Sequence, residues 1–237
     1  MPRLLLINPN TSESVTATLG NAASRTYGDS VEVICVTAPF GAPYITGEHS
    51  LAIAAHATLE ARSRYLASGP TIQGCLIACF GDPALQALEE LGEEPVIGLA
   101  EASMRAAAKR GPFAIVTGGH GWKEPLRRLA FSIGLLDHLV SIETVEASGA
   151  QLAADPAWAN DILGGACLAA LKTGQSHMSS RKPASIIVGG AGLMGFAGKL
   201  QDSVPVPLLD SVQCGLEAAA ERLGITLERT ASASASA

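Results

Sequence analysis

The stretch RLLLINPNTSE, residues 3–13, decides how the chain folds. Four apolar residues in a row, residues 4–7, lead directly into the polar turn Asn8-Pro9-Asn10-Thr11-Ser12. A continuous apolar run, rather than an alternating one, is typical of a strand buried on both faces, as strands of parallel sheets are. The last two residues of the turn suit a helix cap, and Glu13 adds negative charge to a first helical turn. The stretch therefore predicts a strand, a polar turn and a helix.

The same alternation continues along the chain, because apolar runs of strand length are separated by Ala- and Leu-rich stretches of helical length. This pattern predicts an α/β fold in which helices cover both faces of parallel sheets. The expected strands are residues 4–7, 31–36, 75–78, 96–98, 113–116, 139–144, 186–188 and 207–209. The expected helices are residues 12–23, 51–68, 83–91, 102–110, 124–133, 156–173 and 211–223.

Three landmarks recur after about 110 positions, which is the pattern of an internal repeat. The matched pairs are Asn8 and Thr117, Cys79 and Gly190, and Pro95 and Pro205. We interpret them as two pseudo-symmetric α/β half-domains with the site in the cleft between them, although chance matches in any alternating chain are the alternative. The first half is expected to comprise residues 1–98 and 206–224, and the second residues 99–205. Residues 225–237 end in a low-complexity Ala/Ser tail that we expect to be disordered.

Composition narrows the function. Hydrophobic residues make up 48% of the 237 residues and charged residues 16%, which is enough for a large core. The net charge is −6 and no Lys/Arg block occurs, which argues against nucleic acid and anionic membranes as partners. No leader or membrane-length apolar run is seen, and the five cysteines form neither a zinc motif nor a disulfide framework. We expect a cytoplasmic protein with a small-molecule substrate and no metal or organic cofactor, and the sequence leaves self-association open.

Cys79 is the side chain that we expect to react. It follows a predicted buried strand and precedes Asp82-Pro83, a pair typical of a helix start. A thiol near a helix N-terminus has a lowered pKa and ionises more readily. It also lies at the sheet edge where α/β folds bind ligands. A free cysteine is more often an inert buried residue, and that interpretation fits Cys35, Cys75, Cys167 and Cys214.

Other strand exits are expected to line the same edge. Asn8, Asn10 and Thr11 offer donors for a carbonyl or carboxylate group at a helix start. Glycine-dense exits let a ligand approach backbone N–H groups, and neither contains a phosphate-binding motif. A plain turn is the alternative at each exit. The further binding residues that we expect are Phe80, Gly81, Thr117, Gly118, Gly119, Gly190 and Ala191.

Two more side chains complete the predicted site. His120 is the histidine expected at a strand exit facing the cleft, where it would act as an acid or base. Tyr44 belongs to the Gly-, Pro- and aromatic-rich loop 39–47, which is long enough to close over a ligand. A structural role, and a rigid connector in the case of the loop, are the alternatives. The other histidines are expected in or near a helix or at the surface: His49, His56, His138 and His177.

Together these segments resemble the hydantoin and allantoin racemases of the aspartate/glutamate racemase superfamily. Residues 7–12 are similar to the family's opening signature and residues 78–83 to its first catalytic cysteine segment. Residues 189–192 are similar to its second, which usually reads Gly-Cys-Ala-Gly. The resemblance extends from about residue 4 to residue 223 and implies two pseudo-symmetric halves with the site between them. It also implies proton transfer by two cysteines on opposite faces of the substrate carbon, but Gly190 occupies the second position and cannot carry a proton.

Three interpretations of the reaction are open. In the first, which is the default, another group such as His120 replaces the missing acid, and the enzyme racemises a hydantoin-type ureide or small carboxylate. In the second, Cys79 protonates an enolate after decarboxylation, as a single cysteine does in the similar arylmalonate decarboxylases. In the third, Cys79 adds to a double bond or carbonyl, as in the similar maleate cis–trans isomerases, or opens a ring by hydrolysis. Each needs an oxyanion pocket. A non-catalytic ligand sensor is the remaining alternative.

Overall fold

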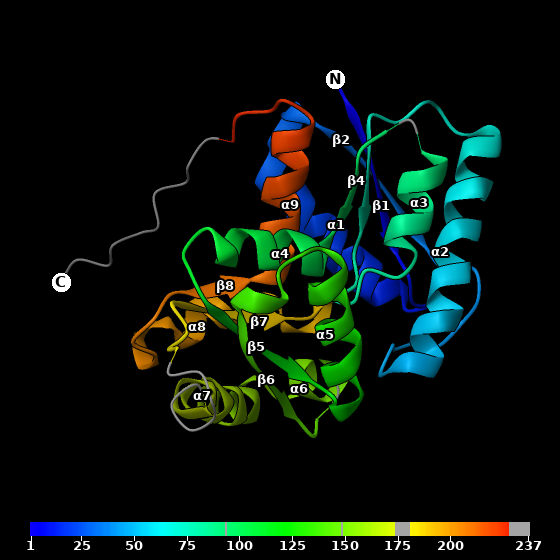
Figure 1. The fold of residues 1–237 in the computed structure, drawn as a ribbon. Helices are drawn as coiled ribbons and strands as arrows, with labels where there is room; N and C mark the ends of the chain where they lie inside the picture. Colours follow the sequence, from blue (N-terminus) through cyan, green and yellow to red (C-terminus); the bar gives the residue numbers. More distant parts are fainter. Residues whose placement is uncertain (93, 148, 174–180, 228–237) are drawn as a thin grey trace.

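A computed structural model gives the fold of the chain and describes residues 1–92, 94–147, 149–173 and 181–227 (Figure 1). Its strands are β1 (Arg3–Asn8), β2 (Glu32–Thr37), β3 (Gly74–Ile77), β4 (Val96–Gly98), β5 (Phe113–Gly118), β6 (Leu139–Val145), β7 (Ser185–Gly189) and β8 (Leu208–Asp210). They form two parallel four-stranded sheets, in the orders β2-β1-β3-β4 and β6-β5-β7-β8. The predicted α/β fold with two similar halves is therefore confirmed.

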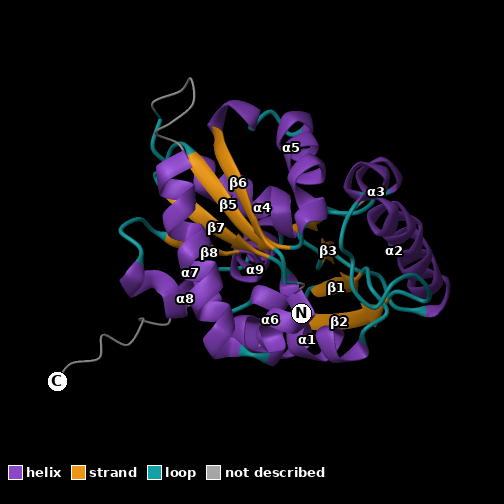
Figure 2. Cartoon of the chain, turned by 90° about the horizontal axis from the view of Figure 1, so that it is seen from below, coloured by secondary structure: helices purple, strands orange, loops and turns teal. Residues whose placement is uncertain are grey.

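Helices cover both faces of each sheet. They are α1 (Glu13–Tyr27), α2 (Glu48–Ser68), α3 (Leu85–Leu91), α4 (Leu99–Ala108), α5 (Lys123–Ser132), α6 (Gly149–Ala154), α7 (Pro156–Thr173), α8 (Phe196–Leu200) and α9 (Ser211–Arg222). Figures 1 and 2 show α2 and α3 on one side of the first sheet, with α1 and α9 on the other. The second sheet has α7 and α8 on one side and α4 and α5 on the other. The helices expected from the sequence did not include α6 and α8.

The strand register makes the repeat specific. Leu4 of β1 pairs with Gly74 of β3, and Phe113 of β5 pairs with Ser185 of β7. Counting the same number of residues from Gly74 and from Ser185 leads to Cys79 and Gly190. These two residues therefore occupy equivalent positions in the two halves.

Two helices lie between the sheets and join the halves. After β4, α4 leads from the first sheet towards the second, and after β8, α9 leads back. The two helices pack against each other, and a Cβ placed on Gly215 of α9 would lie only 2.3 Å from Leu99 Cδ2 of α4. Glycine at this position therefore permits the close approach. The larger hydrophobic core spans the first half, this junction and the side of the second sheet that α4 and α5 cover, and a smaller one lies on the other side of the second sheet.

We expected residues 206–224 to belong to the first half, and the structure places α9 there but not β8. β8 pairs with β7 in the second sheet, whereas α9 packs on β3 and β4 of the first. Residues 206–224 are therefore shared between the halves. The predicted tail lies outside the described residues from residue 228 onward, as does His177.

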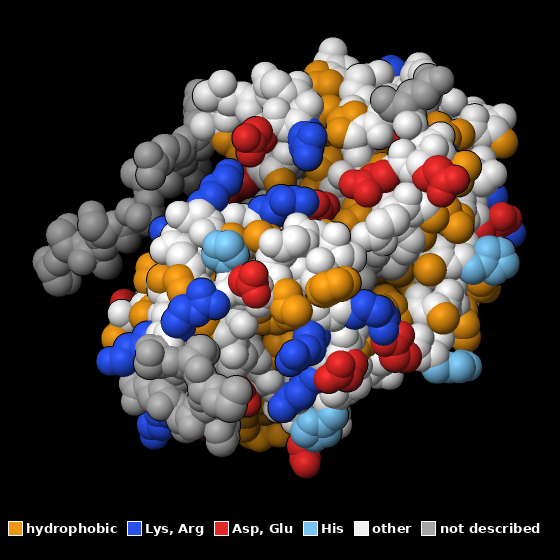
Figure 3. All heavy atoms as spheres, viewed as in Figure 1, with side chains coloured by type: hydrophobic (Ala, Val, Ile, Leu, Met, Phe, Trp, Pro, Cys, Tyr) orange, Lys and Arg blue, Asp and Glu red, His pale blue; other side chains and the backbone are white. Residues whose placement is uncertain are grey.

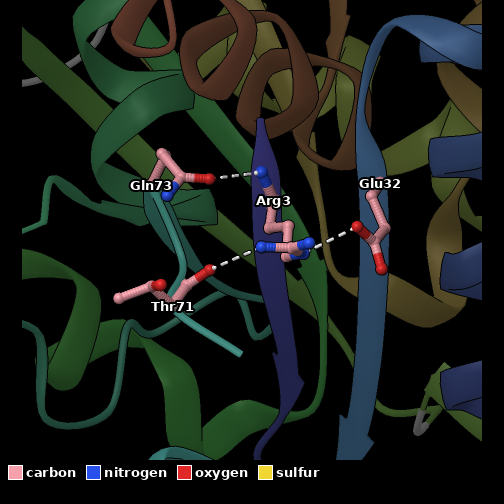
Figure 4. A network of polar contacts seen from close by, with 4 residues as sticks. All are labelled: Arg3, Glu32, Thr71 and Gln73. Atoms are coloured by element: carbon pink, nitrogen blue, oxygen red, sulfur yellow. Dashed lines mark hydrogen bonds and ion pairs between the residues drawn. The ribbon is translucent and has the colours of Figure 1, made fainter. Parts of the chain in front are cut away.

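Polar contacts fix the end of the first sheet that lies away from the cleft (Figure 4). Arg3 Nε donates to Glu32 Oε2 at 2.7 Å, which ties β1 to β2. The backbone N–H of Arg3 donates to the Gln73 side chain at 2.8 Å, just before β3. These contacts align the amino ends of the strands, and the carboxyl ends are left for the site.

The surface mixes charges of both signs. On the face drawn in Figure 3, Lys and Arg side chains alternate with Asp and Glu, and no block of one sign stands out. Within the described part of the chain, no helix has the length and apolar character needed to cross a membrane.

Candidate active site

A cavity of about 90 Å³ lies where strand exits of the two halves meet. A water-sized group takes about 10–15 Å³ of such space, so the cavity has room for roughly six to nine of them, the size of one small heterocycle. Its walls are Asn10, Val15, Tyr44, Ile45, Thr46, Ala78, Cys79, Phe80, Thr117, Gly118, Gly119, Trp122, Gly149, Gly189, Gly190, Ala191, Gly192 and Leu193.

Cys79 is placed in this wall by the turn that follows β3. Its carbonyl accepts hydrogen bonds from the N–H groups of Gly81 at 2.9 Å and Asp82 at 3.1 Å, which fold the turn back beneath the thiol. The residue is only 9% exposed. Burial raises the pKa of the Cys79 thiol, and the negative charge of Asp82 raises it further. The prediction of a lowered pKa is therefore wrong, because burial favours the protonated thiol.

The helix expected next to Cys79 begins later than predicted. Asp82 and Ala84 have φ values of 47° and 67°, in the left-handed region, and α3 starts only at Leu85. The Asp82 side chain does not cap α3. It accepts hydrogen bonds from Ala100 N at 2.9 Å and Glu101 N at 2.7 Å in the first turn of α4. Burial raises the pKa of Asp82 to about 7, although these hydrogen bonds favour its ionised form.

The side chains of the two asparagines in the Asn-Pro-Asn turn have different roles. Asn8 is fully buried, and its Nδ2 donates to Asn10 Oδ1 and Thr16 Oγ1, each at 2.9 Å. Asn10 lines the cavity, and its Oδ1 also accepts from Ser12 N at 2.9 Å. Among the described residues, Asn10 Nδ2 has no hydrogen-bond partner and is free to donate to a ligand. Asn8 thus positions Asn10 and does not itself line the cavity.

Thr11 and Gly81 also support the cavity from outside its walls. The N–H of Thr11 donates to Ala42 O at 3.1 Å, which ties loop 39–47 to the Asn-Pro-Asn turn. A Cβ on Gly81 would lie 2.4 Å from the ring of Trp122, so the two are in close contact. Both were expected to bind substrate directly, and the structure places neither in the wall.

Where the first half contributes the Cys79 thiol to the cavity wall, the second half contributes backbone atoms. Thr117 Oγ1 donates to Gly189 O at 2.7 Å, which joins the exits of β5 and β7. Gly190 has a φ of 137°, and its N–H donates to Ser211 Oγ at 3.0 Å. A Cβ there would meet Leu193 Cγ at an ordinary 3.5 Å, so space is available although the backbone conformation is strained for other residues.

His120 does not reach the cavity. It begins the 3₁₀ turn His120–Trp122, which points the imidazole to solvent, with its side chain 63% exposed. Its Nδ1 lies 3.2 Å from Thr144 Oγ1 and its Nε2 3.5 Å from Glu146 Oε1. The expectation that His120 faces the cleft is wrong, and Trp122 at the other end of the turn lines the wall instead.

Two aromatic rings cross between the halves. A Cβ on Gly189 of the second half would lie 2.1 Å from the ring of Phe80, and Gly81 of the first half stands in the same relation to Trp122. Each half therefore packs an aromatic ring against a glycine of the other half. Sequence reasoning missed Trp122, although a tryptophan directly after a glycine-dense exit is a signal for it. It also missed Ile45 and Thr46, although both lie in the loop 39–47 that was singled out, and Ala78, Gly189 and Gly192, which are next to expected site residues or in the same strand exit. Val15, Gly149 and Leu193 were missed as well and have no local signature.

The cavity is electrically neutral. None of the described residues in its wall is an Asp, Glu, Lys, Arg or His. Its polar groups are amide, hydroxyl, thiol and backbone. No cluster of three metal-ligating side chains occurs within the described ranges.

Comparisons with known proteins agree with this geometry. Residues 4–219 match the family model described as Asp/Glu/Hydantoin racemase. A hydantoin racemase from Paenarthrobacter aurescens is 29% identical over 218 residues, which are 92% of this chain and 89% of that protein. An allantoin racemase from Klebsiella pneumoniae has a TM-score of 0.81 at 30% identity, covering 98% of this chain and 92% of the other. One from Pseudomonas fluorescens has a TM-score of 0.83 at 23% identity, over 97% and 94% of the two chains.

The fold and these relatives define an isomerase of the racemase class. The chain belongs to the Asp/Glu/Hydantoin racemase family.

Proposed function

We propose that this enzyme racemises a small, uncharged cyclic ureide of the hydantoin type, at the ring carbon next to a carbonyl. The observation that carries the proposal is the neutral cavity wall. The names of the relatives, hydantoin racemase and allantoin racemase, support the same substrate class.

Charge separates a ureide from the family's other substrate type, the free amino acids. An amino acid brings a carboxylate and an ammonium group, and burying either without an oppositely charged partner is costly. Among the described wall residues no such partner is present, whereas a ureide presents only neutral N–H and C=O groups. The same argument disfavours the dicarboxylate substrate that a decarboxylase or a maleate isomerase would require.

Donors suited to a ureide carbonyl are available in the wall. Asn10 Nδ2 is free, and the N–H groups of Phe80 and Ala191 have no backbone or side-chain acceptor within the described chain. When the α-proton leaves, negative charge moves to the adjacent carbonyl oxygen. Fixed donors aimed at that oxygen stabilise the enolate, and this kind of stabilisation is usually the largest single contribution to catalysis.

Cys79 is the proposed base on one face of the carbon. Burial makes its thiolate scarce, but a thiol that gives up its proton reluctantly yields a strongly basic thiolate. A strong base suits a weak carbon acid, because proton transfer is most effective when donor and acceptor strengths are matched.

The test uses enantiopure 5-methylhydantoin in deuterium oxide, with NMR following loss of the ring C–H signal and chiral chromatography following inversion. The wild-type enzyme is expected to give both above the solvent rate. Cys79→Ala is expected to lower both by about 10²- to 10⁴-fold, as loss of a proton-transfer group does. Cys35→Ala is the matched control, because Cys35 is exposed and outside the wall. Aspartate and glutamate are run in parallel, and their racemisation with no reaction of the ureide would overturn the proposal.

A further inference from the structure

Racemisation needs a proton on each face of the substrate carbon, and the strand register leaves one face without a side chain. Gly190 occupies the position equivalent to Cys79. We propose that the hydroxyl of Tyr44, from loop 39–47, carries the proton on the face that Gly190 leaves bare. This inference rests on the proposed racemisation of a ureide.

Elimination among the wall side chains favours Tyr44. Within the described wall, the side chains with a polar hydrogen besides Cys79 are Asn10, Tyr44, Thr46, Thr117 and the indole of Trp122. Amides, alcohols and indoles give up a proton far less readily than a phenol does. Thr117 in addition already donates to Gly189 O. A phenol is thus the one remaining type of group that can give and take a proton.

The loop anchors hold Tyr44 over the junction of the halves. On one side of it, Ala42 O accepts from Thr11 N of the first half. On the other side, Thr46 and Gly47 lie against Gly121 of the second half, where a Cβ would be 2.4 Å from Thr46 O and 3.0 Å from Gly47 Cα. Tyr44 lies between these anchors, lines the cavity and is 39% exposed.

An ion pair secures the second anchor. Glu48, the first residue of α2 after the loop, accepts from Arg128 of α5 at 2.5 Å and 3.0 Å. Since α2 belongs to the first half and α5 to the second, this two-bonded contact keeps the loop across the cleft. The Tyr44 hydroxyl itself has no partner among the described residues, so it is available to a ligand.

The proton balance closes without a further reactant. The Cys79 thiolate takes the ring proton from one face while the Tyr44 hydroxyl delivers its proton to the other. The enzyme is left with a Cys79 thiol and a Tyr44 phenolate, which is the form that converts the opposite enantiomer. The reactive form of the pair has first lost one proton to solvent, so the two groups share one negative charge during the proton transfer, and nothing is oxidised or reduced.

The test compares isotope exchange with inversion in Tyr44→Phe. Without the hydroxyl, Cys79 can still exchange the ring proton of the enantiomer that presents its C–H to the thiolate. Inversion is expected to fall at least about 100-fold, while exchange with retention of configuration continues for that enantiomer. Tyr65→Phe is the matched control, because the Tyr65 hydroxyl is buried without a partner among the described residues and lies outside the wall.

Two results would overturn the role of Tyr44. Inversion unchanged in Tyr44→Phe would remove it from proton transfer. Exchange and inversion falling by the same factor would mean that Tyr44 only binds or orients the substrate. A wild-type enzyme that neither exchanges nor inverts the ureide would instead contradict the proposed function, and with it this inference.

Discussion

The two half-domains have the same strand order and register, but each holds its site loop in its own way. In the first half the carboxylate is on the loop, where Asp82 caps α4. In the second it is at the end of β8, directly before α9, where Asp210 caps α9 and also accepts from Gly195 N of the loop at 2.5 Å. In both, a carboxylate joins loop to helix, buried in the case of Asp82 and half-buried in the case of Asp210. The loop is therefore held independently of whether a cysteine or a glycine stands at its start, which explains how residue 190 can lack a thiol without a change of fold.

The largest expected effect tests the carboxylate of the first half. Burial raises the pKa of Asp82 to about 7, whereas an unfolded Asp titrates near about 3.9. Between these values the folded protein binds an extra proton, so its free energy of unfolding falls as the pH rises from about 4 to about 7, by up to about 4 kcal/mol. Asp82→Asn is expected to remove this dependence of the free energy of unfolding on pH. Denaturant titrations between about pH 4 and about pH 7 measure it.

Asp202→Asn provides the control for Asp82→Asn, because Asp202 is exposed. Asp210, whose pKa burial also raises, contributes equally to the wild type and to both variants and cancels in the comparison. Identical slopes for the wild type and Asp82→Asn would refute the assigned role.

The next effect tests the two rings that cross between the halves. Gly189→Ala is expected to destabilise the protein by about 1 to 3 kcal/mol, because its Cβ overlaps the buried Phe80 ring. The displaced ring would narrow the cavity, so kcat/KM should fall as well. Gly81→Ala should behave in the same way through Trp122.

Gly198→Ala is the matched control, since nothing lies within 4 Å of the added methyl group. Thermal unfolding and the ureide assay are measured for all three variants. If Gly189→Ala is as stable and active as Gly198→Ala, the contact does not hold the halves together.

The smallest expected effect concerns the missing thiol. Gly190→Ala should cost about 1 to 2 kcal/mol, from the positive φ alone, because the methyl group has room. Gly190→Cys has the same strain but adds a proton carrier. In a Tyr44→Phe background it should restore inversion at least about tenfold, whereas Gly190→Ala should not. Equal inversion rates for the two double variants would show that another group carries the proton on the second face of the substrate carbon.

Local sequence was sufficient for the strands and for the edge at which the site lies. Runs such as residues 4–7 and 113–116 are fully apolar, and buried parallel strands require this pattern, so the expected bounds differ from the observed ones by at most two residues. The position of Cys79 opposite Gly190 follows from the repeat, because equal topologies put equivalent strand exits at equivalent places.

The predictions that were wrong depend on contacts between residues far apart in the sequence. Asp82 was expected to cap the next helix, but the N–H groups that donate to it lie 18 and 19 residues further on, in α4. The direction of His120 depends on a short 3₁₀ turn, and burial of Cys79 depends on packing from both halves. No local pattern encodes any of these.

The packing of Gly215 against Leu99 has a consequence for the range of molecules that the enzyme admits. The first turn of α4 holds the loop of Cys79, and the first turn of α9 holds the loop of Gly190. The spacing of these two helices thus sets the width of the opening between the loops. A bulkier residue at Gly215 would spread the helices apart and widen the mouth for larger ring substituents, although Gly215 itself lies outside the cavity wall.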